Sequence, residues 1–156
     1  MKVLIVVDVQ KGFMIDKYMC LGERINKYLL ENYYDKVIFT KYVNDINQNP
    51  LFQRKLGYKK MIEKDEQEIA AEMPKGAIVF EKYGYGLEQK DLQYIKSLNV
   101  ESLDLCGLES DACVYAVALQ LWDEGVYPNI LINYVEGKNN MKDIYVRQFG
   151  GVDERI

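Results

Sequence analysis

Short, continuous runs of apolar residues constrain the fold of this chain more than any other feature. The first run covers residues 3–7, all Val, Leu or Ile, and ends at Asp8. Such a run is typical of a strand that is buried on both faces of a parallel sheet. Similar runs predict four more strands, at residues 37–40, 77–80, 102–106 and 130–133.

Segments with apolar residues at helical spacing lie between these runs. They predict helices over residues 22–33, 61–73, 87–98 and 142–149, and a further helix that follows Ser110 and stops at Gly125. Strands that alternate with helices form βαβ crossovers. The predicted fold class is therefore α/β: one domain over residues 1–156, a three-layer, doubly wound, mainly parallel sheet of about five strands with helices on both faces.

In such sheets, sites form beyond the carboxyl ends of the strands. This rule selects Asp8, residues 41–45, the pair Glu81 and Lys82, and residues 107–113. The longest segment without a predicted helix or strand, residues 43–60, leaves the second strand. We interpret it as a lid or a substrate-binding loop.

Composition excludes several classes of protein. With 49% hydrophobic and 28% charged residues, the chain is typical of a globular protein rather than a disordered one. A formal charge of −4 disfavours nucleic acid as a partner. Three widely spaced cysteines suggest neither a disulfide framework nor a zinc cluster, and fit a reducing, cytoplasmic setting. Because the first apolar run stops after five residues, we expect neither export nor a membrane span.

The chain contains no histidine. This excludes Ser-His-Asp and Cys-His catalysis together with metal binding through imidazole. Any catalysis must use carboxylates, lysine, tyrosine or cysteine.

Three such residues share one edge of the predicted sheet. Cys113 follows a strand and a tight turn, near the start of a helix whose free N–H groups and dipole favour a thiolate. Each residue also has a structural interpretation: Cys113 as a small apolar residue of a buried helix face, Asp8 as a turn former or helix cap, and Lys82 as a solvated lysine. Together they are a sufficient set for nucleophilic catalysis without histidine.

Three motifs in register carry a resemblance to a known family. Residues 8–13 resemble D-x-Q-x-x-F, Lys82 after its strand is similar to a catalytic lysine, and residues 107–114 resemble G-x-x-T-D-x-C-V. The chain thus resembles the isochorismatase-like cysteine hydrolases, which include nicotinamidases and N-carbamoyl amidohydrolases.

The resemblance implies a triad of Asp8, Lys82 and Cys113. Asp8 would act as general base and then acid, and Lys82 would hold the charges and lower the thiol pKa. Cys113 would attack a carbonyl carbon and form a thioester that water hydrolyses. A cis peptide is implied at Leu108–Glu109, with the N–H groups of Glu109 and Cys113 binding the oxyanion.

The resemblance also implies that Gln10 and Phe13 line the substrate pocket. We add Tyr42 and Tyr85 as candidate substrate contacts, because several of the 13 tyrosines cluster at predicted strand ends and loops. An equally open interpretation is that these tyrosines cover sheet edges or the interface of a homo-oligomer.

The chain departs from metal-dependent nicotinamidases, which carry Asp-x-His and further histidines after the second strand. Here residues 40–45 read Thr-Lys-Tyr-Val-Asn-Asp. We therefore expect neither a metal nor another cofactor.

The leading hypothesis is a metal-independent cysteine hydrolase of a small-molecule amide, carbamoyl or related C–N substrate. Two alternatives remain: a catalytically silent binding domain of the same fold, and an isochorismatase-type hydrolase of vinyl ethers. A flavodoxin-like nucleotide-binding domain ranks last, because no glycine-rich loop follows the first strand.

Overall fold

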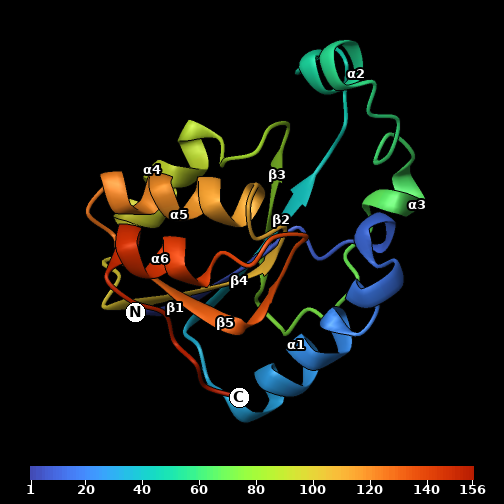
Figure 1. Cartoon of the computed structure of the whole chain (residues 1–156). Helices are drawn as coiled ribbons and strands as arrows, with labels where there is room; N and C mark the ends of the chain where they lie inside the picture. Colours follow the sequence, from blue (N-terminus) through green and yellow to red (C-terminus); the bar gives the residue numbers. More distant parts are fainter.

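Five parallel strands form the centre of the molecule, in the spatial order β3-β2-β1-β4-β5 (Figure 1). The computed structural model describes the backbone of residues 1–156 and every side chain except that of Asp16. The strands are β1 (Lys2–Val7), β2 (Lys36–Tyr42), β3 (Ile78–Lys82), β4 (Ser102–Leu108) and β5 (Pro128–Glu136). The prediction of an α/β fold with a mainly parallel sheet is confirmed.

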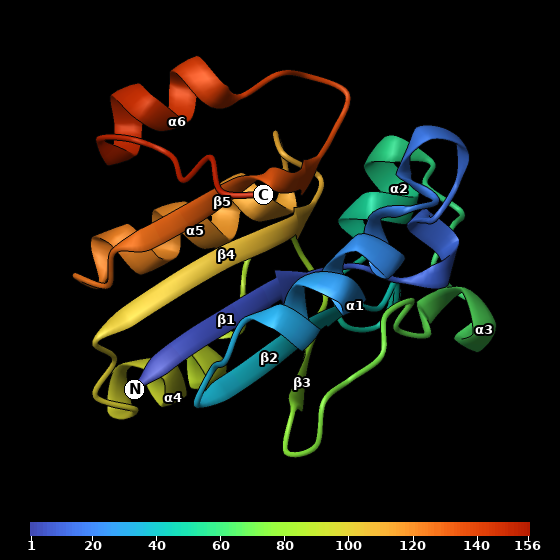
Figure 2. The same cartoon turned by 90° about the horizontal axis from the view of Figure 1, so that it is seen from below.

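Helices cover both faces of this sheet, so the predicted three layers are present. Alternate residues of β1 point to opposite faces: Val3, Ile5 and Val7 join the core beneath α4, α5 and α6, and Leu4 and Val6 join the core beneath α1. Figure 2 shows α1 in front of the sheet, with α4 and α5 behind it. The elements are α1 (Leu21–Glu31), α4 (Gln89–Ser97), α5 (Cys113–Asp123), α6 (Lys142–Phe149) and two 3-10 turns, η1 (Lys11–Phe13) and η2 (Asp16–Tyr18). None of the described helices is both long and apolar enough to cross a membrane.

The helix predicted over residues 61–73 is wrong except for one turn, α3 (Lys64–Gln67). Two interactions compete with the helix. The side chain of Gln67 donates to the carbonyl oxygens of Met61 and Ile62, at 2.9 and 3.0 Å. After α3 the chain is drawn into an extended bridge between Ile69 and Gln10. Backbone pairing with the segment after β1 therefore outweighs the helical spacing.

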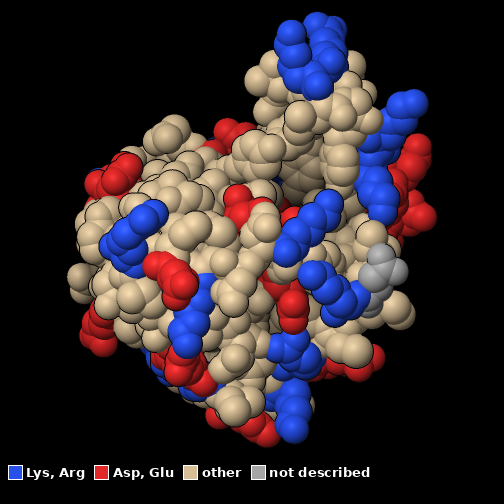
Figure 3. Space-filling model, in the orientation of Figure 1, with Lys and Arg blue, Asp and Glu red and all other residues tan. Residues whose placement is uncertain are grey.

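Residues 43–60 form a projecting segment, named here the arm (Figure 1). It contains a short helix that the sequence did not predict, α2 (Leu51–Leu56), in which no residue is buried. In Figure 3 the tip of the arm is a protruding lobe that carries basic side chains, and α2 contributes Arg54 and Lys55. The base of the arm is fastened by Asn44, whose side-chain amide donates to the carbonyl oxygens of Tyr58 and Lys60, at 3.1 and 2.8 Å.

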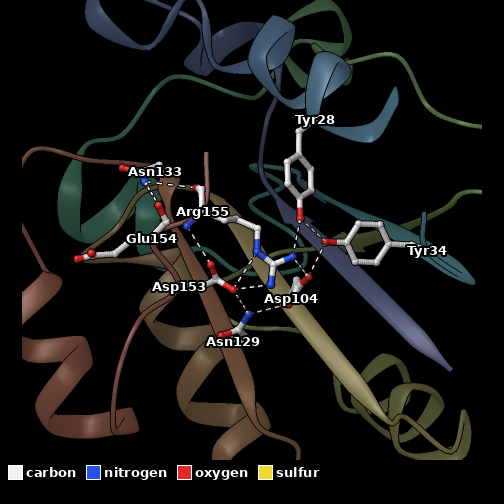
Figure 4. A network of polar contacts seen from close by, with 8 residues as sticks. All are labelled: Tyr28, Tyr34, Asp104, Asn129, Asn133, Asp153, Glu154 and Arg155. Atoms are coloured by element: carbon white, nitrogen blue, oxygen red, sulfur yellow. Dashed lines mark hydrogen bonds and ion pairs between the residues drawn. The ribbon is translucent and has the colours of Figure 1, made fainter. Parts of the chain in front are cut away.

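A polar network ties the C-terminal segment to the sheet (Figure 4). At its centre is Asp104 on β4, which is 3% exposed and accepts hydrogen bonds from Tyr34 at 2.5 Å and Asn129 at 2.8 Å. Arg155 forms ion pairs with Asp104 and Asp153. Burial, followed by the bond to Asp104, raises the pKa of Tyr34, so this hydroxyl remains a neutral donor. The network lies at the opposite edge of the sheet from Asp8.

Candidate active site

Asp8 is held where β1 ends by contacts from both neighbouring strands. Its N–H donates to the Thr40 hydroxyl at 3.0 Å, and that hydroxyl donates to Oδ1 of Asp8 at 2.6 Å. The backbone of Asp8 is left-handed, with φ of 52°, a conformation that Asp tolerates better than most residues. On the other side is Gly107, where an added Cβ would lie 2.1 Å from the Val7 carbonyl oxygen. Only glycine lets β4 approach β1 so closely here.

Lys82 forms a buried ion pair with Asp8. Its Nζ lies 2.8 Å from Oδ2 of Asp8, and the two side chains are 0% and 1% exposed. Nζ also donates to the carbonyl oxygens of Gly84 and Tyr85, at 2.8 and 3.2 Å. Burial alone would lower the pKa of Lys82, but its interactions with Asp8 and Cys113 leave that pKa raised. Lys82 is the last residue of β3 rather than the residue after it, and it is a charged ammonium.

Cys113 is the first residue of α5 and interacts with both members of this pair. Burial, followed by the charge of Asp8, raises the pKa of its thiol, and Lys82 opposes this effect. Burial and the neighbouring carboxylate therefore oppose the thiolate that the helix start and Lys82 favour. In the free site these effects favour a neutral thiol that lies beside a carboxylate.

Two backbone donors face the same region. The Leu108–Glu109 peptide bond is cis. The carbonyl oxygen of Glu109 accepts from the N–H groups of Ala112 and Val114, at 3.2 and 3.1 Å. Among the described groups, neither the N–H of Glu109 nor that of Cys113 has a backbone acceptor.

A pocket of about 250 Å³ opens above the thiol, beneath the lobe seen in Figure 3. Five of the twelve residues that line it are aromatic, and they include three of the predicted contacts, Phe13, Tyr42 and Tyr85. The remaining residues that line it are Asp8, Phe52, Leu56, Tyr58, Gly84, Leu108, Glu109, Cys113 and Lys138. Aromatic walls with a few convergent polar groups are typical of sites for small planar ligands.

The prediction that Gln10 lines this pocket is wrong. Gln10 is 0% exposed, and its side-chain amide is fully engaged by the backbone. Nε2 donates to the carbonyl oxygens of Tyr42 and Gln67, both at 2.9 Å, and Oε1 accepts from the Tyr42 N–H at 2.9 Å. Gln10 therefore fixes Tyr42 and the segment after α3, and it does not line the pocket.

Among the residues of the site that sequence reasoning missed are Thr40, Phe52, Leu56 and Lys138. Thr40 carried a signal, since it is the polar residue that ends an apolar run at the same sheet edge as Asp8. Phe52 and Leu56 lie on the unpredicted α2, and Lys138 lies in the loop after β5. The spacing of these three residues indicates nothing about their place in the pocket.

Comparison with protein families decides where this chain belongs. The model of the isochorismatase domain matches residues 2–133, a stretch that includes Asp8, Lys82 and Cys113. The chain belongs to the isochorismatase family. A search of curated protein sequences gives no significant match.

Solved structures of this fold include several amidases. The chain is similar to N-carbamoylsarcosine amidase from Thermoplasma acidophilum, with a TM-score of 0.79 and 18% identity over 99% of this chain and 95% of that one. It is also similar to the pyrazinamidase/nicotinamidase from Streptococcus mutans UA159, with a TM-score of 0.82 and 16% identity over 98% and 99%. The pyrazinamidase of Pyrococcus horikoshii in complex with zinc has a TM-score of 0.78 and 19% identity, over 97% of each chain. At these identities the likeness shows the fold.

The polar side chains that follow β2 do not fit a zinc ion. Nδ2 of Asn44 donates to two carbonyl oxygens of the arm, and Oδ1 of Asn44 accepts from the side chain of Gln53 at 3.2 Å. The side chain of Asp45 accepts from the N–H of Asn47. Within the described residues, no three Cys, Asp or Glu side chains are grouped as metal ligands, and the whole chain lacks histidine.

Proposed function

We propose that this protein hydrolyses a small amide, carbamoyl or related C–N substrate without a metal, through a thioester on Cys113. The observation that carries the proposal is the convergence of a thiol, a carboxylate and an ammonium at one pocket. The Asp8–Lys82 pair is closed off from solvent and joined at 2.8 Å, and Cys113 interacts with both partners. This constellation supplies a nucleophile, a base and a fixed positive charge without histidine.

Asp8 carries the proton through both halves of the reaction. Oδ2 of Asp8 accepts the thiol proton as the sulfur of Cys113 attacks the substrate carbonyl carbon. The protonated carboxyl then gives that proton to the leaving nitrogen, the C–N bond breaks, and a thioester remains on Cys113. Water attacks the thioester after losing a proton to Asp8, and that proton returns to the sulfur when the acid product leaves.

Two other parts of the site stabilise charge. The free N–H groups of Glu109 and Cys113 donate to the oxyanion that forms in each half. Lys82 remains protonated throughout, because its Nζ is fixed by Asp8 and by two carbonyl oxygens. Since the pKa of the free thiol is raised, proton transfer to Asp8 accompanies the attack rather than preceding it.

Family membership and the amidase neighbours support a hydrolase of C–N bonds. One neighbour is named for a carbamoyl substrate, and another is named for planar aromatic amides. The aromatic lining of the pocket suits a flat substrate of this size.

A screen for ammonia release from amides and carbamoyl compounds, run in the presence of a chelator, tests the proposal. We expect activity with the chelator present and its loss in Cys113→Ala. The matched control is Cys20→Ala, since Cys20 is an exposed cysteine outside the pocket. If no compound releases ammonia but ligands bind the pocket, the protein is a silent binding domain and the proposal fails.

A further inference from the structure

A buried hydroxyl without a partner lies in the wall of the pocket. Tyr42 is 4% exposed and lines the cavity that contains Cys113. Its hydroxyl has no hydrogen-bond partner within the described residues. Buried polar groups in folded proteins are nearly always paired, because an unpaired one costs free energy. An orphan hydroxyl at a ligand pocket therefore indicates a partner that the ligand supplies.

The ring of Tyr42 is held in place from several sides. Gln10 binds both the N–H and the carbonyl oxygen of the Tyr42 backbone. The ring stacks with Phe13 at 6.5 Å between centroids, and the Lys82 ammonium lies 5.5 Å from its centroid. A phenol fixed in this way presents its hydroxyl in one direction at little further cost in entropy.

The hydroxyl is a donor rather than an anion at neutral pH. Burial, together with the negative charges that Tyr58, Cys113 and Asp8 carry when ionised, raises the pKa of Tyr42 above its ordinary value of 10.0. A neutral phenol both donates and accepts one hydrogen bond. Tyr42 lines the same pocket as Asp8 and Cys113, so a ligand that reaches the thiol also lies within reach of the tyrosine.

Two side chains of the pocket wall beside Tyr42 belong to the arm, which is also bonded to β3's following turn through Asn49, whose amide donates to the Tyr83 carbonyl oxygen at 3.0 Å. The Phe52 ring centroid lies 5.2 Å from that of Tyr42, and Tyr58 lines the same pocket. Phe52 is on α2, which has no buried residue, whereas Asn44 fastens the base of the arm. The Tyr42 hydroxyl is buried in the free protein, so a ligand atom bonds to it only where this aromatic packing opens.

Resting on the function proposed above, we propose that Tyr42 is a substrate-positioning residue that donates a hydrogen bond to an acceptor atom of the amide. The substrate is then a neutral, planar amide with an acceptor, such as a ring nitrogen, outside the reacting carboxamide. The Tyr42 hydroxyl supplies at this sheet edge a substrate contact that needs no metal.

A matched pair of ligands tests this role by binding alone. We would titrate pyridine-3-carboxamide and benzamide into the Cys113→Ala protein, which cannot form a thioester, and measure both dissociation constants by calorimetry. The pyridine ligand should bind about five-fold or more tightly than benzamide, and Tyr42→Phe in the same background should abolish that ratio. Tyr18→Phe is the control, because Tyr18 has the other buried hydroxyl without a partner but does not line the pocket. It should preserve the ratio.

Three results would overturn the role of Tyr42: binding of neither ligand, equal binding of both, or a preference that survives Tyr42→Phe. The proposed function is tested separately. It fails if Tyr42→Phe abolishes the ratio of dissociation constants but the wild-type protein releases no ammonia from either amide. The converse result is that the wild-type protein releases ammonia in a reaction that requires Cys113, while the ratio of the two dissociation constants is the same in Tyr42→Phe. That result supports the hydrolase and refutes the positioning role.

Discussion

Replacing Lys82 by methionine should destabilise the protein strongly. In the folded state Nζ of Lys82 lies 2.8 Å from Oδ2 of Asp8, with both side chains buried. At an effective dielectric constant of 20, unit charges at that separation attract by about 6 kcal/mol, most of which offsets desolvation. Lys82→Met removes the attraction and leaves a buried carboxylate, so we expect a loss of about 3–5 kcal/mol in the free energy of unfolding. The carbonyl oxygens of Gly84 and Tyr85 also lose their donor.

Urea denaturation followed by circular dichroism measures this loss, and a double-mutant cycle isolates the pair. Because Asp8→Asn with Lys82→Met removes both charges, the double variant should be more stable than the sum of the single losses predicts, by about 2 kcal/mol. The raised pKa of Lys82 means that its contribution is complete below its ordinary value of 10.5 and is lost as pH rises through the folded pKa. A loss below about 1 kcal/mol in Lys82→Met, or strict additivity, would refute the buried ion pair.

Two further perturbations have directions that follow from the pKa shifts. The first is alkylation of Cys113 by iodoacetamide, followed by peptide mass spectrometry. It should become faster in Asp8→Asn and slower in Lys82→Met, because Asp8 raises and Lys82 lowers the pKa of the thiol. Alkylation of buried Cys106 reports any unfolding, and rates at Cys113 that change in the same direction in both variants would contradict the triad. At the C-terminus, the bond to Arg155 lowers the pKa of Asp153, so its contribution to stability is present above 3.8 and is lost as pH falls below that value. Thermal unfolding should therefore show that Arg155→Ala is less stable than wild type at neutral pH and that the gap narrows in acid, whereas Arg147→Ala, an exposed control, shows no such trend.

The strands were predictable because burial on both faces leaves an unbroken apolar run. Residues 3–7 are all 0% exposed, which is why the run stops only at the sheet edge. The same rule placed Asp8 and Cys113 at one edge without any knowledge of the fold. Lys82 was found by its position after an apolar run, although the strand itself extends to include it.

Other parts of the structure depend on contacts that no local pattern encodes. Gln10 lies in a motif beside the site, yet its amide binds the backbone of Tyr42 and Gln67, which are distant in sequence. The segment over residues 61–73 has helical spacing but pairs instead with the chain after β1. Phe52 reaches the pocket through contacts of the arm that are distant in sequence, namely the bond from Asn49 to Tyr83 and the packing of Phe52 on Tyr85.

The acid–base state of Cys113 also needed the structure. Its place at the start of α5 and near Lys82 favours a thiolate, but burial and the neighbouring Asp8 carboxylate dominate. Sequence shows which charged groups come together, whereas the sign of a pKa shift depends on their burial and distances.

Trapping of the covalent intermediate tests the central claim most directly. The wild-type protein would be mixed with the amide that releases ammonia fastest, quenched in acid within the first turnover, and digested for peptide mass spectrometry. We predict an acyl group on Cys113 that hydroxylamine removes, with no adduct in Cys113→Ala. Ammonia release at an undiminished rate in Cys113→Ala, or an acyl group on a different residue, would contradict the account.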